Sequence, residues 1–276
     1  MAEWSTFLAA VCVLVLVLLV LARVSSTMLS EAVESRDEPP DLSLTHSDEP
    51  MGNGDAEDTT VFDEPADPPS TARPPSQQPS STDTPQLSTA ALLANVVFTQ
   101  GLFAGLLVAL AWYTEIPPWA FGLSTDHVSA GAVGLGIGVG GVCYVLNEAA
   151  MRAGRRYGMT PPTALRKALA PETPAGWVVL FVVVLPVIAG FEELLFRGAL
   201  IGVVHAGFEV PLWLLAIGSS VAFGLGHGAQ GRVGILITGL LGVGLAGVFI
   251  WTGNLIVVIV AHYVINALEF AIHEWE

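Results

Sequence analysis

Seven long apolar runs divide the chain, and each is about as long as a helix that crosses a lipid bilayer. The first run, residues 6–22, is unbroken apolar sequence. The other six lie near residues 90–113, 127–147, 176–204, 210–228, 233–251 and 254–272. The breaks between them carry helix-ending residues such as Pro117, Pro161 and Gly253.

These runs are too long and too uniformly apolar for the strands of a membrane barrel. Only helices and closed barrels satisfy the backbone in lipid, so the pattern predicts an all-α fold, a polytopic transmembrane helical bundle of about seven spans. Composition agrees, because 53% of the residues are hydrophobic and only 13% are charged, whereas soluble domains average about 25% charged. We expect a multi-pass protein of the cell membrane that has the lipid bilayer itself as a partner.

Residues 27–88 differ from the rest of the chain. They hold 14 acidic and 2 basic residues, are rich in Pro, Ser and Thr, and show no hydrophobic period. Such a segment cannot bury enough apolar surface to offset the entropy of ordering. We therefore predict three parts: an N-terminal transmembrane anchor (1–26), a disordered acidic linker (27–88) and a six-span core (89–276). The net charge of −15 belongs mostly to the linker, and nothing in the sequence predicts a nucleic-acid partner.

Basic residues predict the orientation of the bundle. The connection at residues 151–174 holds five of the eight basic residues outside the linker, which places it in the cytoplasm by the positive-inside rule. Counting spans from there puts the linker and the C-terminus in the cytoplasm and the N-terminus outside. The run at 176–204 is longer than one bilayer requires, and if it formed two elements the later orientations would reverse.

Two other patterns are interpreted as structural. Gly136, Gly138 and Gly141 match a dinucleotide-binding pattern but lie in an apolar span without the soluble strand-turn-helix unit that such a motif needs. Small residues four apart, Gly134 with Gly138 and Gly136 with Gly140, instead favour close helix contact. Glu269 and His273 are also four apart, a spacing that a metal could use, but an interfacial helix end explains them more simply.

The segment AGFEELLFRGAL carries three ionisable residues within an apolar run. Each costs at least about 2.5 to 3.5 kcal/mol in a membrane span, so they require a structural or chemical reason. Glu193 and Arg197 are four apart on one helical face and can neutralise each other. Glu192 points about 100° away, which keeps its carboxylate apart from that ion pair and suits it to general base chemistry.

Two later spans add further polar groups. His227 follows Phe223 by four residues, and His262 precedes Asn266 by four, which places each pair on one helical face. Convergence on one internal cavity would spare all three spans from facing lipid with polar groups. Two alternatives remain open on physical grounds: a polar network that only holds helices together, and an ion or proton pathway of a transporter.

These residues resemble the motifs of the CAAX protease and bacteriocin-processing (CPBP, or ABI) intramembrane peptidases, which include the type II CAAX prenyl endopeptidase. The family pattern is Glu-Glu-x-x-x-Arg, then Phe-x-x-x-His, then His-x-x-x-Asn, each on a separate span. All three motifs occur here in that order, within about residues 176–276. The residues concerned are Glu192, Glu193, Arg197, Phe223, His227, His262 and Asn266.

The resemblance implies that the chain is an endopeptidase acting in the membrane on membrane-associated proteins or peptides, including C-terminally lipidated ones. Glu192 would activate water, His227 would orient that water or bind a metal, and His262 with Asn266 would stabilise the oxyanion. His227, His262 and Glu192 would also make a plausible zinc set with an open position. A metal-free glutamate mechanism uses the same residues, and a non-proteolytic transporter or scaffold is the alternative function.

Overall fold

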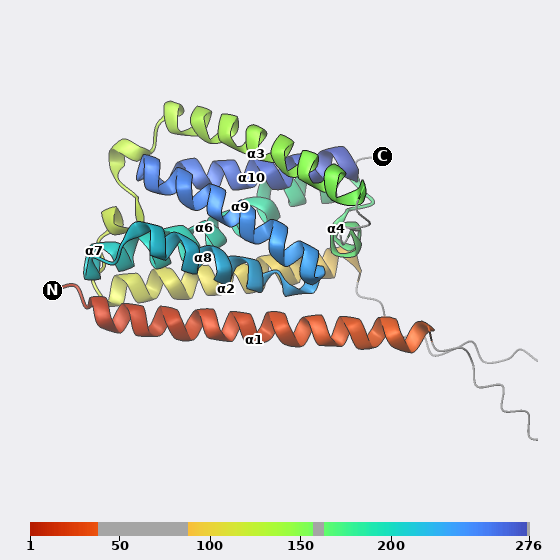
Figure 1. The fold of residues 1–276 in the computed structure, drawn as a ribbon, viewed down its shortest axis with the longest axis horizontal. Coiled ribbons are helices and arrows are strands. Elements are labelled where there is room, and N and C mark those ends of the chain that lie inside the picture. The colour runs from red at the N-terminus through yellow and green to blue at the C-terminus, as the bar shows by residue number, and fades with distance from the viewer. Residues whose placement is uncertain (38–87, 157–162, 275–276) are drawn as a thin grey trace, which may run out of the picture.

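The apolar runs form helices that lie nearly parallel or antiparallel in one bundle (Figure 1). The structure, a computed structural model, describes residues 1–37, 88–156 and 163–274. Its elements are α1 (Trp4–Asp37), α2 (Thr89–Tyr113), η1 (Pro118–Phe121), η2 (Thr125–His127), α3 (Ala130–Arg156), α4 (Ala164–Leu169), α5 (Pro174–Val179), η3 (Leu180–Val184), α6 (Leu185–Glu193), η4 (Leu194–Val203), α7 (Val204–Phe208), α8 (Leu212–Gly226), η5 (Gly228–Gln230), α9 (Gly231–Thr252) and α10 (Leu255–His273).

The all-α prediction is confirmed, and within the described residues six helices are long and apolar enough to cross a membrane. The fifth predicted run, residues 210–228, corresponds to α8, which is apolar but shorter, at 15 residues. At 1.5 Å per residue it is about 22 Å long, less than the roughly 30 Å of a hydrocarbon core. His227 directly follows its last residue, so the end of α8 sets the position of His227 along the bundle.

The long fourth run is one continuous element. Residues from Pro174 to Phe208 stay helical throughout, although two stretches, η3 and η4, have π-helical hydrogen bonding. Pro174 occupies the first turn, and the side chain of Thr173 accepts a hydrogen bond from the Gly176 amide at the helix start. The run is therefore one candidate span and not two elements, which is the arrangement that the predicted orientation of the later spans assumes.

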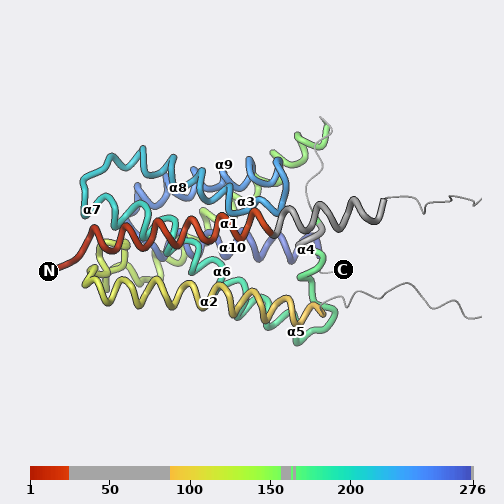
Figure 2. The backbone as a smooth tube through the Cα atoms, turned by 90° about the horizontal axis from the view of Figure 1, so that it is seen from below, coloured from red at the N-terminus to blue at the C-terminus, as the bar shows by residue number. Residues whose placement is uncertain are grey.

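Helix α1 is part of the bundle and not a detached anchor. The side chains of Phe7 and Val11 are fully buried against the core, and the Trp4 ring lies against Gly207. The backbone amide of Glu3 also donates to the carbonyl of Thr114 at 2.8 Å. Figure 2 shows α1 running along the bundle between α2 and α8.

Helix α1 also extends further than the sequence pattern indicates. It continues to Asp37, past residue 27 at which the predicted linker begins, and the disorder of the linker stays a prediction. A helix already formed by an apolar span adds one hydrogen bond for each further residue, which favours continuation past the end of the apolar run. The rest of the predicted linker, 38–87, lies outside the described residues.

The glycines of α3 serve helix packing, as predicted, but through one of the two spaced pairs only. A Cβ atom at Gly136 would lie 2.8 Å from the carbonyl oxygen of Val257, and one at Gly140 would lie 2.7 Å from that of Ala261. Gly134 and Gly138 have no such neighbour. The backbones of α3 and α10 therefore meet along the Gly136 and Gly140 face, and this contact fixes the helix that carries His262.

One end of the bundle gathers ion pairs. Arg166 of α4 binds both Glu269 and Glu274 beside the end of α10, and Glu148 of α3 binds Arg152. The same end holds the start of α2 and the end of α3, while the N-terminus, η1 and α7 lie at the other end (Figure 1). By the positive-inside rule, the ion-paired end is the one predicted to face the cytoplasm.

Cysteine labelling tests that orientation. In a variant without Cys12 and Cys143, a Thr125→Cys residue at the η2 end should react with an impermeant thiol reagent in intact cells, because it is expected to face outward. A Lys167→Cys residue on α4 should react only after the cells are permeabilised. Both side chains are exposed in the structure, so accessibility within the fold does not limit either reaction. The opposite labelling pattern would show that the basic end faces outward.

Candidate active site

A cavity of about 490 Å³ lies between α2, α3, α4, α6, α8, η5, α9 and α10. It reaches the ion-paired end of the bundle, where Arg155, Arg166 and Glu269 contribute to its wall. Its lining also includes the sequence-predicted residues Glu192, His227, His262 and Asn266. The cavity is therefore open toward the predicted cytoplasmic side and carries the candidate chemistry in its wall.

Glu193 and Arg197 form the buried ion pair predicted from their spacing. Glu193 Oε1 accepts from Arg197 Nη1 at 2.8 Å, and both side chains are at most 1% exposed. Arg197 Nη2 also donates to the backbone carbonyl of Gly242 on α9 at 3.1 Å, and its guanidinium carbon lies 4.6 Å from the centre of the Phe223 ring. Pairing, hydrogen bonding and the aromatic face together compensate for burying this cation.

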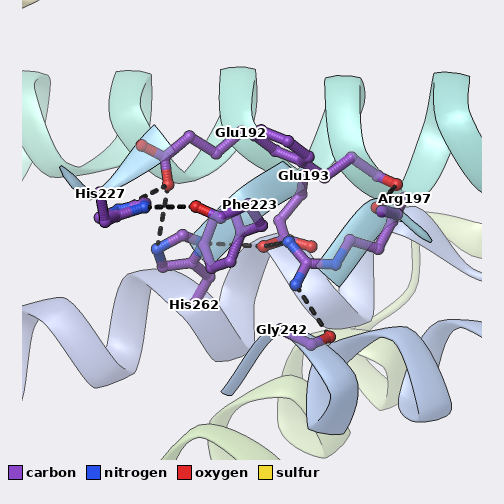
Figure 3. A network of polar contacts seen from close by, with 9 residues as sticks. Glu192, Glu193, Arg197, Phe223, His227, Gly242 and His262 are labelled. Carbon is purple, nitrogen blue, oxygen red and sulfur yellow. Dashed lines mark hydrogen bonds and ion pairs between the residues drawn. The ribbon is translucent and has the colours of Figure 1, made fainter. Parts of the chain in front are cut away.

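The same carboxylate positions His262. Glu193 Oε1 lies 2.7 Å from His262 Nδ1, so one oxygen atom links the arginine of η4 with the imidazole of α10. An ionised carboxylate only accepts hydrogen bonds, so Nδ1 carries a hydrogen. The other ring nitrogen, Nε2, then points toward Glu192, as Figure 3 shows.

Glu192 faces the two histidines and not the ion pair. Its Oε2 atom lies 3.9 Å from His227 Nε2 and 3.7 Å from His262 Nε2 (Figure 3). This oxygen is buried and makes no direct hydrogen bond to the described part of the chain. The prediction that the two adjacent glutamates point in different directions is confirmed, because they lie about 100° apart on the helix.

His227 is oriented by the end of α8. Its Nδ1 atom lies 2.9 Å from the carbonyl oxygen of Phe223, and a carbonyl oxygen can only accept. Nδ1 must therefore donate, which leaves Nε2 of a neutral ring with a lone pair directed at Glu192. The side chain is 23% exposed, so water has access to it.

The structure brings all six sequence-predicted site residues together, with two positions relative to the cavity. Glu192, His227, His262 and Asn266 line the cavity, whereas Glu193 and Arg197 lie behind this wall. Glu269 and His273 do not form a joint site, because Glu269 binds Arg166 while His273 lies 3.5 Å from Glu148. Their interpretation as polar residues at a helix end is confirmed.

Phe223 was named in a sequence motif without a role, and two further contributors, Gly242 and Gln100, were missed. The Phe223 ring lies between Arg197 and both histidines, with centroids 4.8 Å from that of His227 and 5.9 Å from that of His262. The Gly242 carbonyl has no side-chain signal that could reveal it. Gln100 of α2 also lines the cavity, and an amide inside an apolar span was the signal that could have identified it.

Glu192, His227 and His262 form the zinc set that the resemblance predicts. Across residues 1–37, 88–156 and 163–274, no group of three or more His, Cys, Asp or Glu side chains is placed so that it could hold a metal ion, and this includes Glu192, His227 and His262. A zinc site at these three residues stays a prediction, and the mechanism proposed for the site uses protein groups alone.

Comparison with known proteins identifies the region that holds this site. Residues 174–268 match the family model described as type II CAAX prenyl endopeptidase Rce1-like. No match was found among curated proteins or among solved structures. The matched region contains Glu192, Glu193, Arg197, His227, His262 and Asn266, and it begins at the start of α5. Residues 174–268 of this multi-pass helical protein are thus similar to the Rce1-like family of type II CAAX prenyl endopeptidases.

Proposed function

We propose that this protein hydrolyses a peptide bond in membrane-attached protein substrates, with Glu192 and His227 activating the attacking water. The observation that carries the proposal is the position of Glu192 Oε2, which lies within 4 Å of the Nε2 atoms of both histidines in a cavity wall. Similarity of the 174–268 region to an endopeptidase family supports it.

The attacking water would be held between two acceptors. Glu192 Oε2 and the unprotonated His227 Nε2 lie 3.9 Å apart, close enough for one water to donate a hydrogen bond to each. Its lone pair is then free to attack the carbonyl carbon of the scissile bond. One water proton passes to Glu192 as the carbon-oxygen bond forms, and Glu192 later gives it to the leaving amine nitrogen as the carbon-nitrogen bond breaks.

Charge on the carbonyl oxygen would be stabilised from α10. His262 Nε2 and the Asn266 amide lie one helical turn apart on the cavity wall, and both can donate to a developing oxyanion. For Nε2 to donate, His262 must carry a proton on both ring nitrogens. Its Nδ1 would then donate to Glu193 Oε1 at 2.7 Å. With His262 charged, the two positive charges of Arg197 and His262 balance the two carboxylates of Glu192 and Glu193 within the buried cluster.

The cavity favours hydrolysis over transport. Its wall includes side chains from the ion-paired end of the bundle but none from η1, η2 or α7 at the other end. A pore would require groups from both ends. A cavity that opens on one side instead suits a substrate held at that membrane surface, and we propose a C-terminal peptide of a lipid-anchored or otherwise membrane-attached protein.

Peptide cleavage by the full-length protein in proteoliposomes tests this function. We expect hydrolysis of a peptide tethered to the membrane by a C-terminal lipid-bearing segment, faster than that of the same peptide without the lipid. A strong chelator should leave the rate unchanged, because the proposed mechanism uses no metal. Mass spectrometry of the products locates the cleaved bond, and Glu192→Gln provides the inactive control.

Two results would contradict the proposal. Absence of cleavage for both tethered and free peptides would remove the peptidase assignment. Loss of activity in chelator that is restored by adding zinc would retain the peptidase but replace the proposed mechanism with one that depends on a metal.

A further inference from the structure

Helix α2 contributes a polar group to the cavity, although it lies outside the 174–268 region. It packs along α6, the helix that carries Glu192 (Figure 2). Gln100 of α2 lines the cavity together with Glu192 and Ile188 of α6. A residue outside the matched region thus shares a wall with the proposed catalytic base.

The carboxamide of Gln100 is incompletely bonded. Its Oε1 atom is buried and makes no hydrogen bond to the described residues. Thr99, the neighbouring polar residue, differs, because its hydroxyl donates to the carbonyl of Asn95 within the same helix at 2.7 Å. A buried polar atom without a partner destabilises the folded state, so a group that enters the cavity is the natural partner for Gln100.

We propose that Gln100 binds the main chain of the substrate peptide and holds it beside Glu192. This inference rests on the proposed peptidase function and adds a substrate-binding residue to it. A carboxamide has both an acceptor and two donors, so it can pair with the N–H and the C=O of an extended peptide at once. Recognition through the main chain is independent of substrate side chains and leaves the choice of sequence to the apolar part of the cavity.

The proposed hydrogen bond to Gln100 requires a peptide N–H at one position of the substrate. A site built to hydrogen-bond a polar group discriminates strongly against an analogue that lacks it. Replacing the peptide N–H that faces Gln100 by an ester oxygen should therefore weaken binding. The same replacement should have no effect once the amide of Gln100 is gone.

Peptide affinity in an inactive background tests the proposal without requiring turnover. Full-length Glu192→Gln protein in detergent is titrated with a fluorescent lipid-bearing peptide, and Gln100→Leu is then added to that background. We expect Gln100→Leu to raise the Kd about tenfold, the effect of losing one good hydrogen bond with its partner left unpaired, and not to lower Tm. In the active protein it should raise KM more than it lowers kcat.

Asn95→Leu is the matched control. Asn95 lies on the same helix with its side chain exposed and does not line the cavity, so this change should leave peptide affinity unaltered. Single ester replacements are then made along the peptide. At one position the ester should bind more weakly than the amide when Gln100 is present, and equally well in Gln100→Leu.

The outcomes separate this inference from the function on which it rests. Equal affinity with and without the Gln100 amide, or absence of peptide binding in every variant, would overturn it. Binding that depends on Gln100 in a protein that cleaves no peptide would instead leave the inference standing and remove the peptidase function.

Discussion

Glu192→Gln is expected to lower the rate of peptide cleavage by about a thousandfold, within the range contributed by a positioned general base. Gln has nearly the same shape as Glu but cannot take the water proton. The change also replaces a buried charge by a neutral amide, so Tm should stay the same or rise. Cleavage rate and thermal unfolding in one detergent measure both effects.

A second cavity carboxylate provides the control for this substitution. Glu269 also lines the cavity but is paired with Arg166 at the open end, so Glu269→Gln removes the same charge from the same cavity. It should retain activity within about tenfold, since it only alters an ion pair that is partly exposed. Normal cleavage by Glu192→Gln, or equal loss in both variants, would show that Glu192 is not the base.

Glu193→Gln is expected to destabilise the fold, by roughly 3 to 5 kcal/mol, the cost of breaking a buried pair from one side. Arg197 would then be a buried cation without its carboxylate partner, and His262 would lose the group bound to Nδ1. Adding Arg197→Gln should recover part of the stability, because no unpaired charge remains. It should not recover activity, since His262 still lacks its carboxylate. Thermal unfolding and cleavage rate of the two variants separate these effects.

An exposed ion pair provides the comparison that isolates the effect of burial on the stability lost when a pair is broken. The Arg152 side chain is 72% exposed where it binds Glu148, so Arg152→Gln should change stability by no more than about 1 kcal/mol. A comparably small effect for Glu193→Gln would mean that the Glu193 and Arg197 charges are solvated. Full activity in the double variant would mean that Glu193 does not act on His262.

Local spacing made part of the site predictable from sequence. Glu193 and Arg197 were paired correctly because residues four apart share a helical face, and Glu192 was separated from them by the same geometry. The apolar runs located the long helices for a different reason, because a bilayer requires long uninterrupted apolar segments.

Contacts between distant parts of the chain could not be predicted in this way. The Gly242 carbonyl reaches Arg197 from 45 positions away, and every residue has a carbonyl, so no residue type marks this one. The burial of Phe7 and Val11 depends on which face of α1 meets the core, and an almost uniformly apolar run has no pattern that reveals a face. Gly134 and Gly136 are equally small, and only the rotation of α3 against α10 decides which of them makes contact.

The pairing of Glu193 with Arg197 inside one helix has a consequence for biosynthesis. The two charges enter the bilayer together on the same segment, so their opposite signs can cancel before α8, α9 and α10 have been inserted. His262, which also contacts Glu193, belongs to the last of these spans, as does Asn266. The chain can therefore insert the span that carries Glu193 and Arg197 before the later spans, while the full set of groups proposed for hydrolysis is assembled only when α10 joins the bundle. A partly inserted chain would hold Glu192 but lack the groups proposed to bind the oxyanion, and so could not yet cleave neighbouring proteins.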